Sequence, residues 1–104
     1  MSDVEAAVRA HAGRVVAHDA AAVTDLASGA TVEPPDLLER LLGGSFRGFE
    51  LVAHARIGAH HIVKTKYLGA TTIVVQARWV QEPAAGPWRL HEAQITRIAT
   101  DDEG

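Results

Sequence analysis

The sequence contains no cysteine, few aromatic residues and no long apolar run. Without cysteine the chain forms neither a disulfide scaffold nor a thiolate metal site, and it has no thiol nucleophile. The longest segment without a charged residue is 67–77, far shorter than the ~20 apolar residues that cross a bilayer. The first residues are acidic, whereas a secretory signal begins with basic residues. We therefore expect a cytoplasmic protein without a membrane segment.

The length and composition are those of one folded domain. A chain of 104 residues suffices for a single domain and not for two. Apolar residues make up 47% and charged residues 22% of the chain, which is typical of a globular protein and unlike a disordered one. We expect one domain that spans residues 1–104.

The first part of the chain has the apolar spacing of amphipathic helices. Within residues 3–18 apolar side chains recur every three or four positions, which predicts one helix. Asp19 is a suitable N-cap for a second, short helix that includes residues 26 and 27 and ends at residues 28–29. A third helix is expected between Pro35 and residues 43–44, because proline is tolerated in a first turn and not later.

Beyond residue 46 the apolar period changes to 2, the spacing of β-strands. A breaker-rich loop at 82–87 and an acidic tail at 101–103 flank the last strand. The order of elements indicates an α+β domain, with three N-terminal helices packed on the concave face of a curved antiparallel sheet of about four strands. The expected strands are 49–57, 61–68, 72–82 and 88–99.

Alternating side chains divide this sheet into two faces. Glu92 and Gln94 share a face of the last strand with Trp88 and Leu90, so if that face points inward they are the polar groups that a cavity offers. The outer face then mixes apolar and basic side chains, which suits a contact between two copies, so we expect a homodimer through this face. Its expected members are Val52, Val74, Val80, Ala93 and Ile95, together with Arg56, Arg78, Arg89, Arg97, His54 and His91.

Three segments of the sequence resemble those of a known superfamily. In residues 15–23 an aspartate opens the second helix after an alanine-rich first helix, and residues 86–90 lead from a turn glycine to an aromatic and a basic residue. Residues 30–34 are similar to the strand that carries the catalytic aspartate in ketosteroid isomerases. With the element order, these segments resemble the nuclear transport factor 2-like superfamily, which includes ketosteroid isomerases, polyketide cyclases and scytalone dehydratases. The resemblance implies a cystatin-like α+β cone whose interior binds a small organic molecule.

The resemblance also places the functional positions of the isomerases on this chain. Their helix-one tyrosine falls on His11, and their aspartate base falls on Pro34, with Glu33 beside it. Their second oxyanion donor falls near Gln76 or Ala77. All three positions differ from the isomerase pattern, so steroid isomerisation is not expected.

The residues themselves indicate where acid-base chemistry would lie. His11 is on the apolar stripe of the first helix, so its ring is expected to point between helix and sheet, where an imidazole can exchange protons with a ligand. The structural alternative is a buried neutral ring bonded to a backbone carbonyl or to Glu92; Glu92 and Gln94 either serve the pocket or reach solvent. The candidate catalytic residues are His11 and Glu92, together with Glu33, which the resemblance implies. The expected ligand-binding residues are Val15, Leu38, Trp79, Trp88, Leu90 and Gln94.

The histidines are not spaced for a metal ion. His60 and His61 are neighbours on a strand and therefore point to opposite faces. His11 and His18 lie about 10.5 Å apart along a helix, too far for a shared ion. We expect neither a metal nor another cofactor.

Charge is unevenly distributed along the chain. Residues 1–45 carry 3 basic and 7 acidic side chains, whereas residues 46–100 carry 7 basic and 3 acidic ones. Single-stranded nucleic acid would need aromatic side chains among the basic ones, and both tryptophans belong to the other face, so no nucleic-acid partner is expected. Two hypotheses remain: a domain that binds a small, mostly apolar organic ligand with isomerase or dehydratase-type chemistry, or a non-enzymatic interaction module without an open pocket.

Overall fold

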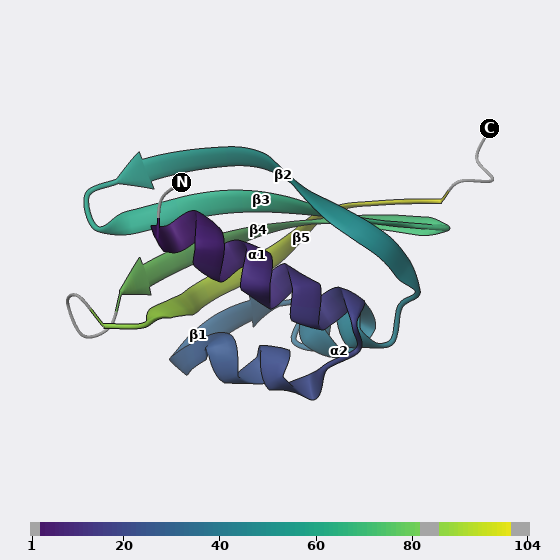
Figure 1. Cartoon of the computed structure of the whole chain (residues 1–104), viewed down its shortest axis with the longest axis horizontal. Helices are drawn as coiled ribbons and strands as arrows, with labels where there is room; N and C mark the ends of the chain where they lie inside the picture. Colours follow the sequence, from purple (N-terminus) through teal and green to yellow (C-terminus); the bar gives the residue numbers. More distant parts are fainter. Residues whose placement is uncertain (1–2, 82–85, 101–104) are drawn as a thin grey trace.

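Figure 1 shows the computed structural model of the chain, which describes residues 3–81 and 86–100. The predicted tail at 101–103 and residues 82–85 of the predicted loop lie outside the described residues. The α+β class is confirmed. The elements in order are α1 (Asp3–Val16), the 3-10 helix η1 (Ala20–Asp25), β1 (Leu26–Glu33), α2 (Leu37–Leu42), β2 (Phe46–Ile57), β3 (His60–Gly69), β4 (Thr71–Gln81) and β5 (Trp88–Thr100).

The sheet has five strands in the order β1-β5-β4-β3-β2. Strands β2 to β5 form the predicted antiparallel meander, and β1 joins its edge beside β5 in parallel orientation. The prediction of four strands, all antiparallel, was therefore wrong at this edge. A parallel neighbour needs a long connection, and α2 with the meander supplies it.

The missed strand begins where the second helix was expected to continue. Asp19 does cap η1, since its side chain accepts a hydrogen bond from the amide of Ala21 at 2.9 Å. However, η1 ends at Asp25, and Leu26 already lies in β1. Gly29 has a φ of 77°, in the left-handed region that suits glycine, where the pairing of β1 with β5 shifts register. Residues 28–29 thus interrupt a strand and do not end a helix.

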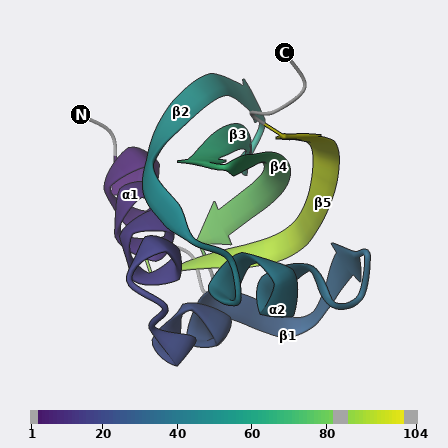
Figure 2. The ribbon, with the colours of Figure 1, turned by 90° about the vertical axis from the view of Figure 1, so that its right-hand side faces the viewer.

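The helices and one face of the sheet enclose the core (Figure 2). The stripe Val4, Val8, Ala12 and Val15 of α1 is buried, as are Leu37, Leu38 and Leu41 of α2. They meet alternate side chains of the central strands, among them Trp79, which is 2% exposed. Trp88 is half-buried and packs against the same core, so both tryptophans face the helices as predicted.

β-Bulges on β5 and β2 change the expected alternation. On β5, Leu90 pairs with Trp79 and Glu92 with Arg78, so His91 is an extra residue. Beyond it Ala93 is buried and Ile95 packs against the core, whereas Glu92 and Gln94 are exposed. The sequence predicted the opposite orientation for the side chains of residues 92–95. These four predictions were wrong because the sequence does not reveal the extra residue at His91.

Another bulge lies on β2. Leu51 pairs with Thr65 and Ala53 with Lys64, so Val52 is the extra residue. His54 and Arg56 consequently pair with Val63 and His61, which lie on the helix-covered face. The prediction that placed His54 and Arg56 on the basic outer face was therefore wrong. No helix among the described residues has the length and apolar content to cross a bilayer.

Candidate functional site

The candidate site is a small cavity between the helices and the sheet. Its volume is about 20 Å³, enough for about one water molecule. The wall is mostly apolar and comes from α1, α2 and strands β1, β3, β4 and β5. The lining residues are Val8, His11, Leu26, Leu37, Leu38, Leu41, Thr65, Tyr67, Val75, Ala77, Trp79, Leu90 and Ala93.

His11 reaches this cavity from the apolar stripe of α1. It is 6% exposed, and its ring packs edge-on against Trp79 with 5.5 Å between the ring centroids. Its Nδ1 lies 2.8 Å from Oδ2 of Asp25. The predicted inward orientation of His11 is confirmed, but its partner is Asp25, neither a backbone carbonyl nor Glu92.

Asp25 is the last residue of η1 and joins two side chains of α1. The same Oδ2 also accepts a hydrogen bond from a guanidinium nitrogen of Arg14 at 2.6 Å. Burial alone would raise the pKa of Asp25, but the hydrogen bonds from His11 and Arg14 and their positive charges outweigh it and lower that pKa below its ordinary value. Asp25 is therefore an ionised group that fixes the His11 ring.

Two buried polar side chains of β3 complete the polar part of the cavity wall. Thr65 is 7% and Tyr67 is 2% exposed, and both line the cavity. Burial, and then the negative charge of Asp25, raise the pKa of Tyr67, so its hydroxyl keeps its proton and can donate. Within residues 3–81 and 86–100, nothing hydrogen-bonds to Nε2 of His11 or to the Thr65 and Tyr67 hydroxyls.

The sequence located the cavity wall better than its polar groups. His11, Leu38, Trp79 and Leu90 do line the cavity. Val15 is buried in the core without lining it, and Trp88 instead packs edge-on against His61, with 5.1 Å between the ring centroids. The remaining three predicted residues lie elsewhere: Glu33, Glu92 and Gln94 are exposed, with Glu33 and Gln94 paired on β1 and β5.

Sequence analysis missed Asp25, Thr65 and Tyr67. A signal for Asp25 was available, because His11 and Arg14 are three residues apart on one helix and face the same way. Two such nitrogen-bearing side chains near the core call for an acidic partner. Thr65 and Tyr67 were placed on a strand, but no pattern distinguished them from ordinary core residues.

The arrangement can bind a polar atom and exchange a proton with it. Because Asp25 holds Nδ1, the ring of His11 is fixed and its Nε2 is left for the cavity. Tyr67 and Thr65 add hydroxyls that can donate to an oxygen. Among the described residues, no three histidine, aspartate or glutamate side chains gather in a way that would hold a metal ion.

Comparison with known proteins identifies the fold. No protein-family model matches the sequence, and no curated protein matches it. The structure is similar to that of an NTF-2-like protein of unknown function from Silicibacter pomeroyi DSS-3, with a TM-score of 0.63 over 95% of this chain and 100% of the other. The two sequences are 10% identical, so the likeness concerns the fold alone. This chain has an NTF-2-like fold, as the sequence resemblance implied.

Proposed function

We propose that this chain binds a small, mostly apolar organic molecule in the cavity beside His11. The observation that carries the proposal is the set of polar groups without protein partners, Nε2 of His11 and the hydroxyls of Thr65 and Tyr67, on the wall of one cavity. A ligand oxygen in the cavity can form hydrogen bonds with two or three of these groups.

The apolar part of the cavity wall indicates that the rest of the ligand is a hydrocarbon body. Leucines of α2 and Trp79 offer apolar surface to a hydrocarbon body, as in most small-molecule sites. The volume of about 20 Å³ means that such a body enters only when the leucines of α2 move. Helix α2 has six residues and lies between a proline pair and a glycine pair, so the segment that has to move is short, and its buried leucines have to leave the core.

The reaction that fits is acid-base chemistry of the isomerase or dehydratase type. In it His11 takes a proton from a carbon next to a ligand carbonyl, and the Tyr67 hydroxyl donates to the carbonyl oxygen as negative charge develops there. Asp25 acts through His11 by holding its ring. Glu92 and Glu33 have no part in this proposal, because both are exposed outside the cavity.

Cyclohexanone is a suitable probe, since it combines a carbonyl with a compact apolar body. NMR in D₂O measures both its binding and the exchange of its α-hydrogens for deuterium. We expect His11→Gln to abolish protein-dependent exchange and Tyr67→Phe to reduce it by about 10²-fold. Glu92→Gln is the matched control and should leave exchange unchanged. Binding that is equal in wild type and in both cavity variants would refute the proposal.

The second candidate is a non-enzymatic interaction module, and the small volume of the cavity favours it. In that case the polar cluster is structural and the outer face of the sheet binds a partner. A homodimer through this face stays a prediction, as does a cytoplasmic location. Ile57 of β2 is 68% exposed and pairs with His60, which places it on the outer face. A charge introduced at this position should therefore disrupt a dimer that forms through this face. If the chain dimerises there, Ile57→Glu should halve its mass in solution; a wild-type mass of one chain at micromolar concentration removes the dimer.

A further inference from the structure

A hollow much larger than the cavity of His11 lies on the sheet face that the helices leave uncovered. Its volume is about 560 Å³, and four strands contribute to it. Val52 on β2 and Thr96 on β5 form opposite sides, and both are the extra residues of β-bulges. Bulges bend a strand and increase its twist, which explains why β2 and β5 curve on either side of β3 and β4 (Figure 2).

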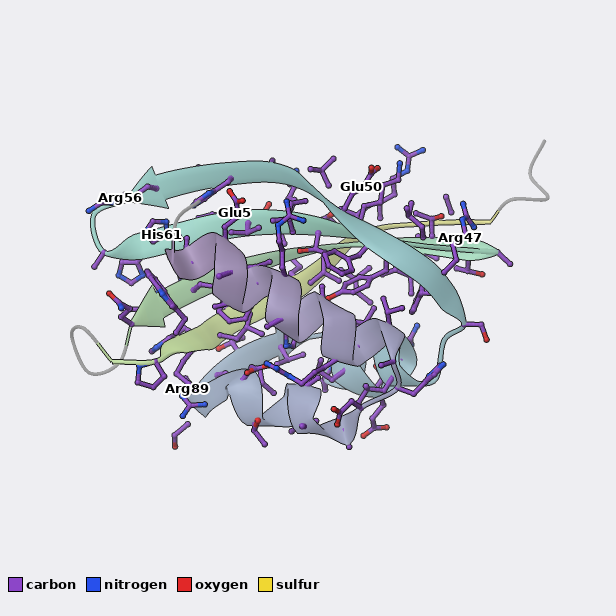
Figure 3. All side chains as sticks on the ribbon, viewed as in Figure 1. Glu5, Arg47, Glu50, Arg56, His61 and Arg89 are labelled. Atoms are coloured by element: carbon purple, nitrogen blue, oxygen red, sulfur yellow. The ribbon has the colours of Figure 1, made fainter. Side chains whose placement is uncertain are left out.

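The groove is positively charged. Lys64 and Lys66 extend from β3 and Arg97 from β5. Neither Lys64 nor Arg97 forms an ion pair with any residue among 3–81 and 86–100. Lys66 approaches Glu50, labelled on β2 in Figure 3, at 3.8 Å, and both side chains are more than a third exposed, so this pair leaves most of the positive charge available.

Apolar and hydroxyl groups lie between these cations. Val52 and Val74 offer hydrocarbon surface, whereas the Thr72 and Thr96 hydroxyls already donate to the carbonyls of Gly69 and Val74. A volume of 560 Å³ falls within the range of about 300–1,000 Å³ that small-molecule sites have. A site with this composition complements a molecule that has an anionic head and an apolar body.

We propose that this groove binds an aliphatic carboxylate of medium chain length. The carboxylate lies between the Lys64 and Lys66 ammonium groups and the Arg97 guanidinium, and the hydrocarbon chain lies against the two valines. A second copy of the chain is a poorer occupant, because two identical grooves facing each other bring six like charges together. The site is separate from the cavity of His11, which lies on the other side of the sheet.

Titration with decanoate, followed by calorimetry and by NMR of the threonine and valine methyl groups, tests the proposal. The double variant Lys64→Gln/Arg97→Gln should bind decanoate at least about tenfold more weakly than wild type. Arg9→Gln on α1 removes one positive charge on the helix side and should bind like wild type. Decanol, which lacks the charge, and acetate, which lacks the chain, should both bind more weakly than decanoate.

Three results would overturn the proposal. In the first, the double variant keeps its circular dichroism spectrum and binds decanoate as tightly as wild type. In the second, decanoate affinity falls in His11→Gln and not in the double variant, which places the ligand in the interior cavity. In the third, the double variant changes the oligomeric state and not the affinity, which makes the groove an interface between copies. The substituted side chains extend from the outer face, so the fold should tolerate both changes.

Discussion

Replacing Asp25 with asparagine, a side chain of nearly equal size without the negative charge, should strongly destabilise the protein. The substitution removes the negative charge that accepts hydrogen bonds from both His11 and Arg14. The Arg14 side chain is 32% exposed and can turn to water, whereas that of His11 is 7% exposed and cannot. Losing a hydrogen bond to a charged group costs about 1.5–3 kcal/mol. We expect a loss of about 2–3 kcal/mol at pH 7, equivalent to a melting temperature roughly 10–20 °C lower.

The effect of Asp25→Asn should also depend on pH. The folded pKa of Asp25 lies below its ordinary value of 3.8, so its contribution is complete above that pH and is lost as the pH falls through the folded pKa. The difference between wild type and variant should therefore narrow below pH 3.8. Asp19→Asn is the matched control, since asparagine caps a helix as well as aspartate does. A loss below 1 kcal/mol in urea unfolding, with no pH dependence, would refute this account.

Three further predictions concern packing, pH and register. Leu41→Ala removes a side chain that is 1% exposed and should cost about 2–5 kcal/mol in urea unfolding; a cost below 1 kcal/mol would mean that α2 is not packed as described. Burial, and then neighbouring positive charge, lower the pKa of His61 (labelled in Figure 3) below 6.5, so its contribution is present above pH 6.5 and is lost as the pH falls through the folded value. In His61→Gln the free energy of unfolding should therefore change less between pH 5 and pH 7 than it does in wild type. The same pH dependence in variant and wild type would contradict this prediction. Deleting His91 removes the extra residue, so alternation from Leu90 still points Glu92 outward and Ala93 inward, and the pairing on both sides of the bulge is kept. We therefore expect the deletion variant to keep a cooperative thermal transition; loss of that transition would mean that the bulge itself is required.

Local periodicity was sufficient to predict most of the fold. The four-residue spacing of Val4, Val8 and Ala12 predicted α1, and two-residue alternation predicted the meander. Strand β1 was missed because its alanines and glycine carry no alternating pattern. Its position depends on pairing with β5, about 60 residues later in the chain, and no local signal encodes such a contact.

The site was less predictable than the fold for a related reason. The position of His11 follows from the helical period of its own element, so it could be inferred from a few neighbouring residues. The contact between His11 and Asp25 depends on how the chain turns at His18, whose φ is 60°, and on the length of η1. Glu92 was misplaced because the alternation pattern of a strand does not reveal an extra residue. Each extra residue exchanges the two faces for the residues that follow it, up to the next bulge.

The bulges on β2 and β5 therefore decide which chemistry each side of the sheet carries. On β5 the extra residue His91 turns Glu92 away from the interior, so the titratable residues that line the cavity are His11 and Tyr67, with Asp25 bound to His11. The same two strands, bent again at Val52 and Thr96, enclose the basic groove on the other side. Since the two sites share the sheet but no lining residue, a variant of either one should leave ligand binding at the other unchanged. Coupled losses at both sites would mean that the substitutions act through the fold and not through the side chains named here.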